Sequence, residues 1–335
     1  MAVLTSFIIS LVIGPVVIRK LKALKVGEKI NKGDSAKLDD LHRAKAETPT
    51  MGGLMILAAV IFSTLLWADM TNKYIWVVLL STVWLGLTGF ADDYLKQVKK
   101  RSKGLSAKAK LISQTILGLV LGVIFLTSFQ NSLKLDVPFL KEAALDLDGL
   151  YIIFVIIVVA GTSNAVNLTD GLDGLAIGIV VMVALAFSIL CYVSGNIKLS
   201  EYLLVPYIQG SGELTVFCAS IVGAGLGFLW FNCYPAAIFM GDVGSLALGG
   251  ALGTVALLIR KELLLVIVGG IFVIEALSVI LQVGMFRFTK KRIFKIAPLH
   301  HHFQFLNWPE NKVIVRFWII AALLALLTIV TLKIR

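Results

Sequence analysis

Residues 174–194 read GLAIGIVVMVALAFSILCYVS, a run of 21 residues without one charged side chain. A transmembrane α-helix needs about 20 consecutive, mostly apolar residues to cross the hydrocarbon core of a bilayer. The run follows directly on a polar segment, NAVNLTDGLD at 164–173. Together the two stretches predict a membrane-spanning helix with a polar boundary at its start.

The whole chain has the composition of a membrane protein. Its 335 residues are 58% hydrophobic, whereas soluble domains average about 45–50% apolar residues. We therefore expect an all-α integral membrane protein of about ten transmembrane helices, organised as one polytopic membrane domain over residues 1–335. The expected spans are 2–18, 51–68, 74–91, 111–128, 150–168, 174–194, 214–231, 243–259, 263–286 and 313–332.

The positive charges lie on one side of these spans. The loops 19–50, 92–110 and 287–316 hold 23 of the 31 Lys and Arg residues, and segments on the opposite side hold the other 8. Cytoplasmic loops carry such an excess, so we expect both termini on the external, periplasmic side. The five expected cytoplasmic loops are 19–50, 92–110, 165–173, 232–242 and 287–312.

Several other interpretations are excluded by composition. The net charge of +11 sits in short loops between apolar runs, so no nucleic-acid partner is expected. The first 18 residues carry no charge ahead of their apolar run, unlike a cleavable signal peptide. Cys191, Cys218 and Cys233 lie in or beside apolar stretches, where we interpret them as small core residues. Segment 128–149 is expected to form an external hairpin, and segment 198–209 a short interfacial helix.

Carboxylates gather in the polar segments that face the cytoplasm in this topology. Asp92 and Asp93 follow the span 74–91, where adjacent carboxylates are costly unless they are solvated or paired with cations. They are either a solvated helix end, or Mg²⁺ ligands and partners of a phosphate-binding lysine. Asp242 is a lone carboxylate between apolar runs and therefore a functional-site hypothesis by default. Hard oxygen ligands suit Mg²⁺. With the basic loops, these residues predict a cationic cleft lined by carboxylates.

The polar run 164–174 is more specific. Asp170 and Asp173 are three residues apart and share a face if the segment is helical. Its two glycines permit a tight turn and the close approach of a ligand. Capping of the next helix explains Asp173 alone, but it leaves Asn167 and Asp170 unexplained.

Histidines form another unusual motif, PLHHHF at 298–303. Histidines in a phosphate cleft donate hydrogen bonds or orient the phosphate. A zinc site is the alternative, for which the sequence offers only His42 as a further partner. Glu275 and Gln282 are seven residues apart on one expected span, hence on one face, and either a structural pairing or a ligand contact explains them.

Taken together, these motifs resemble the phospho-N-acetylmuramoyl-pentapeptide transferase family, within the superfamily of polyprenyl-phosphate N-acetylhexosamine-1-phosphate transferases. The Asp-Asp pair and Asp242 are shared across the superfamily, while TPTMGG at 48–53 and the histidine triplet are typical of the muramoyl-pentapeptide branch. The family commonly has an external segment before its first span, and here the span begins at Met1. The matching stretches are Thr48–Gly53, Asp92–Tyr94, Asn164–Gly174, Gly223–Asn232, Phe239–Gly250 and Pro298–His302.

The resemblance implies a reaction in the cytoplasmic (inner) membrane of a bacterium. UDP-N-acetylmuramoyl-pentapeptide gives its phospho-sugar to undecaprenyl phosphate, and the products are UMP and lipid I of peptidoglycan biosynthesis. Mg²⁺ is the implied cofactor, with Asp242 as its ligand. The implied catalytic residues are Asp92, Asp93, Asp242 and His301. The implied substrate contacts are Lys45, Thr50, Lys108, Asn167, Asp170, Asp173, Asn232, Phe239, Gln282 and His302.

Elementary chemistry agrees with this reaction, because two anionic reactants need a cationic cleft and a lipid acceptor needs a groove open to the bilayer. The nearest alternative is a sister enzyme that moves N-acetylglucosamine-1-phosphate. A transporter or flippase would show repeated halves and midplane sites, and an inactive scaffold would not need five polar loops with matched carboxylates. The sequence does not determine the oligomeric state, and a homodimer is compatible with it.

Overall fold

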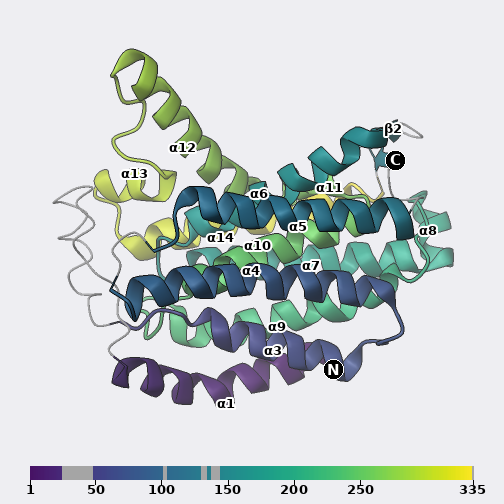
Figure 1. Ribbon diagram of the computed structural model, residues 1–335, viewed down its shortest axis with the longest axis horizontal. Coiled ribbons are helices and arrows are strands. Elements are labelled where there is room, and N and C mark those ends of the chain that lie inside the picture. The colour runs from purple at the N-terminus through teal and green to yellow at the C-terminus, as the bar shows by residue number, and fades with distance from the viewer. Residues whose placement is uncertain (25–47, 101–103, 130–133, 137–143, 334–335) are drawn as a thin grey trace.

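The computed structural model describes residues 1–24, 48–100, 104–129, 134–136 and 144–333 (Figure 1). Within these ranges nine helices are long and apolar enough to cross a membrane, and α3 (Gly53–Trp67) is a shorter apolar helix of 15 residues. The prediction of an all-α integral membrane protein is confirmed. The long helices are α1 (Ala2–Ala23), α4 (Lys73–Gln97), α5 (Ala107–Ser128), α6 (Tyr151–Thr169), α7 (Leu175–Gly195), α9 (Leu214–Asn232), α10 (Gly241–Leu258), α12 (Gly270–Thr289) and α14 (Glu310–Val330).

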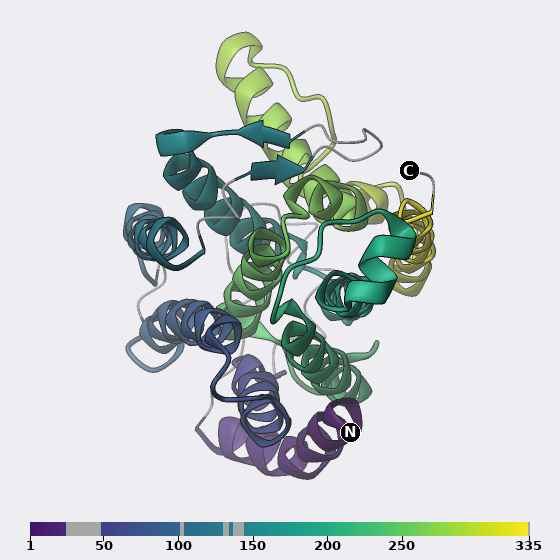
Figure 2. The same ribbon diagram turned by 90° about the vertical axis from the view of Figure 1, so that its right-hand side faces the viewer.

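Successive long helices run back and forth along one direction, and Figure 2 shows the bundle from one end. The chain begins and ends toward the right-hand side of Figure 1, as expected for an even number of crossings. The described parts of the polar connections that the sequence assigns to the cytoplasm lie toward the opposite end. Which membrane face each end occupies stays a prediction.

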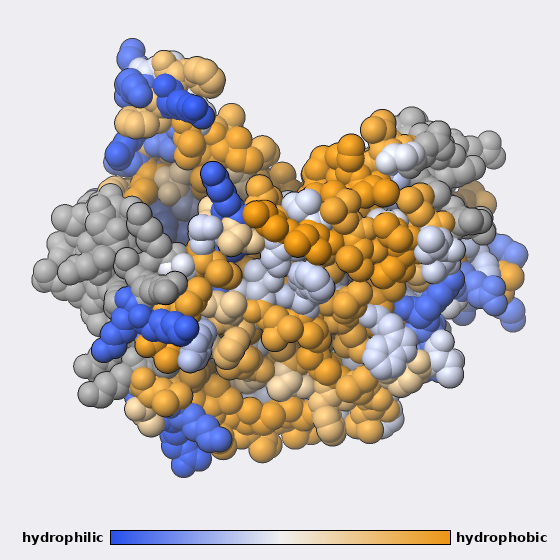
Figure 3. All heavy atoms as spheres, viewed as in Figure 1, coloured by the Kyte–Doolittle hydropathy of each residue, from blue (hydrophilic) through white to orange (hydrophobic). Residues whose placement is uncertain are grey.

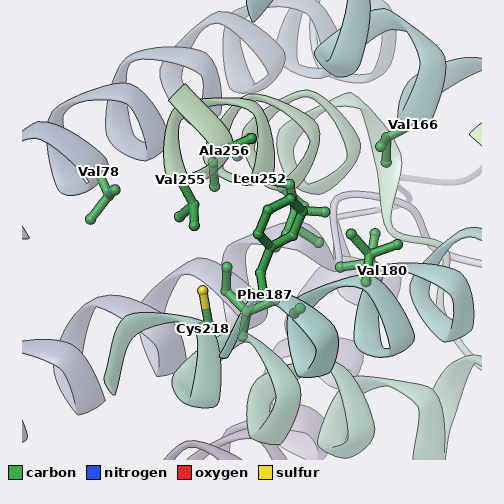
Figure 4. Packing of buried hydrophobic residues seen from close by; sticks show 14 of the residues in the cluster. Val78, Val166, Val180, Phe187, Cys218, Leu252, Val255 and Ala256 are labelled. Atoms are coloured by element: carbon green, nitrogen blue, oxygen red, sulfur yellow. The ribbon is translucent and has the colours of Figure 1, made fainter. Parts of the chain in front are cut away.

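Helix α10 forms the centre of the bundle. Every residue from Val243 to Leu258 is buried, and Leu252, Val255 and Ala256 point into a core that Phe187 of α7 also fills (Figure 4). Glycines let its neighbours approach closely. A Cβ at Gly89 of α4 would overlap the backbone at Asp242, because the two helices touch through main-chain atoms there.

The outer surface matches a lipid environment. Apolar side chains cover the middle of the face in Figure 3, and hydrophilic side chains gather toward its two ends. Many large apolar residues are correspondingly exposed, such as Val12 at 67% and Leu323 at 60%. In a soluble protein, apolar patches of this extent would mark an interface; here they are the lipid-facing surface.

One expected span, 263–286, is interrupted. The structure divides it into α11 (Glu262–Val268) and α12, with the break at Gly269. Glycine has low helix propensity, and glycine pairs are common sites of kinks. Gly270 also packs close to Leu324 of α14, where a Cβ would lie 2.9 Å from the leucine Cδ1. From the break, α12 leans away from the bundle (Figure 1).

Two smaller elements agree with the sequence, and two helix ends do not. The expected hairpin is present as β1 (Lys134–Asp136) paired antiparallel with β2 (Ala144–Asp146). The helix expected at 198–209 is the shorter α8 (Ile197–Leu203), which ends at Leu204 in a left-handed conformation. α4 continues to Gln97 rather than 91, and α6 to Thr169, so residues assigned to loops lie on helix ends.

The close contact between α4 and α10 gives a stability prediction. Gly89→Ala should lower the free energy of unfolding by about 1–3 kcal/mol, because the added methyl has no space beside the Asp242 carbonyl. Gly161→Ala in α6 is the matched control, since nothing lies within 4 Å of its Cβ position. Thermal unfolding in detergent measures both. Equal melting temperatures for the two variants would contradict this packing.

Candidate functional site

Three carboxylates meet where α4 ends and α10 begins. Asp92 and Asp93 lie near the C-terminus of α4, and Asp242 lies in the first turn of α10. One oxygen from each residue lies within 4.8 Å of the other two. Asp92 is fully buried and Asp93 is 3% exposed, whereas the Asp242 side chain is 15% exposed. The cluster is therefore open to incoming groups mainly on the side of Asp242.

Two lysines neutralise this carboxylate cluster. Lys96, one turn after Asp92 on α4, is paired with Asp92 and lies 3.3 Å from Asp242. Lys110, from the first turns of α5, lies 3.1 Å from Asp92 and is also paired with Asp242. Both ammonium groups thus bridge Asp92 and Asp242. Two cations beside three carboxylates leave a local excess of one negative charge if all the groups are ionised.

Backbone and amide donors complete the surroundings of the carboxylates. The Leu105 N–H donates to Asp92 Oδ1 (2.7 Å), and the Val243 N–H at the start of α10 donates to Asp93 Oδ2 (3.2 Å). Asn167, at the end of α6, donates to Asp242 Oδ1 (3.0 Å). Negative charge is favoured at a helix N-terminus, where free N–H groups and the helix dipole attract it. The start of α10 therefore stabilises the cluster.

The segment before α3 passes directly beside the cluster. The Phe239 N–H donates to the Pro49 carbonyl, and the Gly52 N–H donates to the Phe239 carbonyl. Each hydrogen bond is 2.8 Å long. This pairing brings buried Thr50 next to Gly241. Gly241 has φ +74°, and a Cβ there would crowd Asp93 and Thr50, so only glycine fits this turn.

A second polar group joins the loop after α6 to the segment after α9. Asn232 accepts from the Gly174 N–H (3.0 Å) and donates to the Ile238 carbonyl (2.8 Å). Asp173 Oδ2 accepts from the Ala236 N–H (3.0 Å), and the Asp173 N–H donates to Glu310 of α14 (3.1 Å). Asn232 and Asp173 thus hold the loop after α6 against the segment after α9. These contacts are compatible with a further role of both side chains in substrate binding.

The histidine triplet lies on α13 (Leu299–Phe305), a short helix on the polar side of the bundle (Figure 1). His302 Nδ1 accepts from the Lys295 N–H (3.1 Å), and His301 Nδ1 lies 2.8 Å from Gln304 Oε1. Gln282 of α12 accepts from the N–H groups of Ile293 and Phe294 and donates to the Phe294 carbonyl. Gln282 and His302 thus hold the segment between α12 and α13, whereas the His301 contact lies within α13.

The remaining predicted residues are placed as follows. Lys45 lies outside the described residues. Lys108 is exposed on the first turn of α5, two residues before the lysine that reaches the carboxylates. Asp170 follows the last residue of α6 and is half-buried, as is Phe239. The roles expected for these side chains toward a substrate stay predictions.

Sequence reasoning did not single out Lys96 or Lys110. Lys96 carried a usable signal, because it lies four residues after Asp92 and such pairs share one face of a helix. The sequence contained no such signal for Lys110, because the position of this lysine depends on how α5 packs beside α4 and α10. Ser245, which accepts a 2.8 Å hydrogen bond from Asn167, was also missed.

The chemistry of the carboxylate cluster fits Mg²⁺. Mg²⁺ prefers oxygen ligands and is commonly held by one or two carboxylates together with substrate phosphates. Asp242, the ligand that the sequence suggested, is joined in the structure by Asp92 and Asp93 as neighbouring donors. Opposite charge on a bound ion would offset the excess negative charge of the cluster.

Comparison with known proteins shows the family to which this chain is related. The model of glycosyl transferase family 4 matches residues 75–260, and phospho-N-acetylmuramoyl-pentapeptide-transferase signature 1 matches residues 45–57. A phospho-N-acetylmuramoyl-pentapeptide-transferase of Desulfatibacillum aliphaticivorans is 55% identical over 336 residues, covering 100% of this chain and 92% of that protein. This chain belongs to the phospho-N-acetylmuramoyl-pentapeptide-transferase family. A protein of the same name from Desulfosudis oleivorans is 53% identical with the same coverage.

The regions that match the family model and the signature contain most of the residues of the candidate site in this chain. Residues 75–260 contain all three carboxylates and both lysines, and residues 45–57 contain the segment that pairs with Phe239. Glu275 and the histidine triplet lie beyond both matched regions, within the full-length similarity to the curated relatives.

The cluster geometry predicts direct metal binding. Asp242→Asn should weaken binding of Mn²⁺, a spectroscopic substitute for Mg²⁺, by about tenfold or more, since ligand charge sets affinity at oxygen sites. The control is Asp136→Asn, which alters a carboxylate paired with Arg260 and Lys261 instead. Electron paramagnetic resonance of unbound Mn²⁺ during a titration of the purified protein measures the affinity of both variants. Unchanged affinity in Asp242→Asn would exclude Asp242 as a ligand.

Proposed function

We propose that this chain transfers phospho-N-acetylmuramoyl-pentapeptide from its UDP-linked donor to undecaprenyl phosphate, forming lipid I and UMP in peptidoglycan biosynthesis. The observation that carries the proposal is the carboxylate–lysine cluster at one end of a membrane helix bundle, in a chain similar over its full length to transferases of that name. A nucleotide donor comes from the aqueous phase and a polyprenyl acceptor from the bilayer, so a site at this boundary suits both.

The site is proposed to face the cytoplasm of a bacterium, with the protein in its inner membrane. The support is the charge pattern, since 23 of the 31 Lys and Arg residues fall in three loops that the sequence assigns to the cytoplasm, one of which begins with Asp92 and Asp93. The same positive charge attracts the anionic donor and the anionic lipid phosphate.

Mg²⁺ is the proposed cofactor, and Asp242, Asp92 and Asp93 would hold it. When bound, the ion would neutralise negative charge on the donor diphosphate. Lys96 and Lys110 lie within reach of the same region and supply point charges for phosphate oxygens. Asp242 is the most exposed carboxylate and is therefore the one nearest to incoming phosphates.

The reaction exchanges one phosphoanhydride for another. An oxygen of the lipid phosphate bonds to the phosphorus attached to the sugar, the bond from that phosphorus to the bridging oxygen breaks, and UMP leaves with that oxygen. Such a reaction has little driving force, so we expect it to run in both directions. The protein's contribution is mainly alignment and charge stabilisation.

Around the diphosphate, other side chains are proposed to hold the two substrates. The nucleoside and sugar would lie against Asp170, Asp173, Asn232 and Phe239. The further proposed contacts are Lys45, Thr50, Lys108, Asn167, Gln282, His301 and His302.

Asp92 is proposed to order cations rather than to act as a general base. Its Oδ1 accepts from the Leu105 N–H and its other oxygen pairs with Lys96 and Lys110, so both oxygens are already engaged. The second pKa of a phosphate monoester is about 6, so the lipid phosphate is largely dianionic at pH 7. Removing the residual proton would gain only on the order of 0.1 kcal/mol, whereas positioned charges contribute several kcal/mol.

The proposed activity is tested by transfer of radiolabel from UDP-N-acetylmuramoyl-pentapeptide to undecaprenyl phosphate by the purified protein. The expected result is labelled lipid I that requires Mg²⁺ and reverts when UMP is added. UDP-N-acetylglucosamine is the competing donor. Preference for that donor would assign the chain to the sister activity, and transfer from neither donor would overturn the proposal.

The proposed role of Asp92 is tested by the pH dependence of Asp92→Asn. If Asp92 were a base, the rate deficit of the variant would disappear well above pH 6, where the acceptor is fully ionised. We expect instead a deficit of about 100-fold or more that persists from pH 7 to 9, as for loss of a positioned charge. A rate near that of the unaltered protein at pH 9 would establish the base assignment.

A further inference from the structure

Glu275 is a fully buried acidic residue in the middle of a lipid-facing helix. It lies on α12, away from the three clustered carboxylates, and its side chain has no exposure to solvent. Ionisable residues within membrane helices are costly and commonly mark function. Its carboxylate contacts His300 through both oxygens: Oε1 accepts a hydrogen bond from the His300 N–H (3.1 Å), and Oε2 lies 3.2 Å from His300 Nδ1 without forming a hydrogen bond to it.

His300 in turn contacts the two parts of the site that flank it. Its ring centroid lies 4.2 Å from that of His301, the next residue of α13. On the other side, a Cβ at Gly171 would overlap His300 Nε2, so the imidazole lies directly against the loop after α6. His300 is therefore packed between His301 and the loop that carries Asp170 and Asp173.

The loop after α6 has its own anchors, and α13 is held by polar contacts from α12 and by the packing of Phe303 against Trp308 and Phe317. The loop is held by Asn232, by the backbone at Ala236 and by Glu310. α13 follows a long connection from α12, and α12 holds this region at two points, through Gln282 at Ile293 and Phe294 and through Glu275 at His300. Loss of the contact at Glu275 should therefore shift His300 and His301 at the start of α13 rather than the loop.

We propose that Glu275 is a positioning residue that orients His301 toward the reacting phosphates by fixing His300 against the loop at Gly171. The carboxylate accepts the backbone N–H of His300 with one oxygen and places the other oxygen against Nδ1 of the ring, so one side chain fixes both the backbone and the ring of His300. Glutamine has the same shape but no charge, and when its oxygen accepts the backbone N–H it places an NH2 group where a carboxylate oxygen faces His300 Nδ1. The inference rests on the proposed transfer reaction and deepens it.

Glu275→Gln is the decisive variant, and Ser278→Ala is its control. Ser278 is also buried on α12, one turn away, and its hydroxyl donates to the backbone carbonyl of Glu275, so its loss leaves the carboxylate intact. We expect Glu275→Gln to lower kcat by about 10-fold to 100-fold, because small displacements of aligned groups cost that much. The KM for the UDP-linked donor should change less than kcat, since the loop that carries Asp170 and Asp173 is anchored separately.

A double-mutant cycle shows whether Glu275 acts through His301. In a His301→Ala background, Glu275→Gln should cause no further loss of kcat, because the group it orients is gone. Losses that multiply, a rate for Glu275→Gln equal to that of the unaltered protein, or an equal loss in Ser278→Ala would each overturn the inference. Absence of transfer by the unaltered protein would instead overturn the proposed function.

A second variant reaches His300 from the other side and covers the case in which Glu275→Gln does not fold. Gly171→Ala places a methyl against His300 Nε2 while leaving Glu275 in place. It should lower kcat by a similar factor and, like Glu275→Gln, cause no further loss of kcat in a His301→Ala background. Full activity in Gly171→Ala would show that the position of His300 is immaterial and would contradict the inference.

Discussion

The mutual repulsion of three carboxylates within 4.8 Å is the constraint on which the site depends. Carboxylates of like charge at this separation need cations or donors around them, above all where burial removes water. Each compensating group comes from a different element: Lys96 from α4, Lys110 from α5, Asn167 from α6 and the Val243 N–H from α10. The arrangement of four helices at this end of the bundle is thus tied to one local electrostatic requirement.

Close packing of α10 makes this convergence possible. Lipid chains are as apolar as leucine, so helices in a bilayer associate through van der Waals contact and polar bonds, and small residues permit close approach. Gly89 brings α4 against the first turn of α10, and Gly53 brings α3 against Gly244. Both contacts lie within one turn of Asp242. The same glycines that build the core therefore set the separation between the carboxylates of α4 and that of α10.

Much of this was accessible from the sequence, and the reasons for the remainder are physical. Apolar length predicted ten crossings, and isolated carboxylates at their ends predicted where the site lies. The break at Gly269 was not predicted, because hydropathy averages over a glycine that interrupts a helix. The pairing of Lys110 with Asp242 was not predicted either, since it joins residues 132 positions apart and depends on helix packing. Lys108, chosen instead from the family resemblance, is exposed on the same helix.

The contrast between α10 and α12 suggests how such a site combines a rigid part with an adjustable one. Every residue of α10 from Val243 to Leu258 is buried, whereas α12 buries only Ile271, Phe272, Glu275 and Ser278, so apolar packing holds the first helix more firmly than the second. The polar contacts of Glu275 and Gln282 must therefore contribute more to holding α12 and the histidine segment in register. The carboxylate cluster therefore lies on helices held by close packing, whereas the histidines lie on a segment whose position also depends on hydrogen bonds from α12.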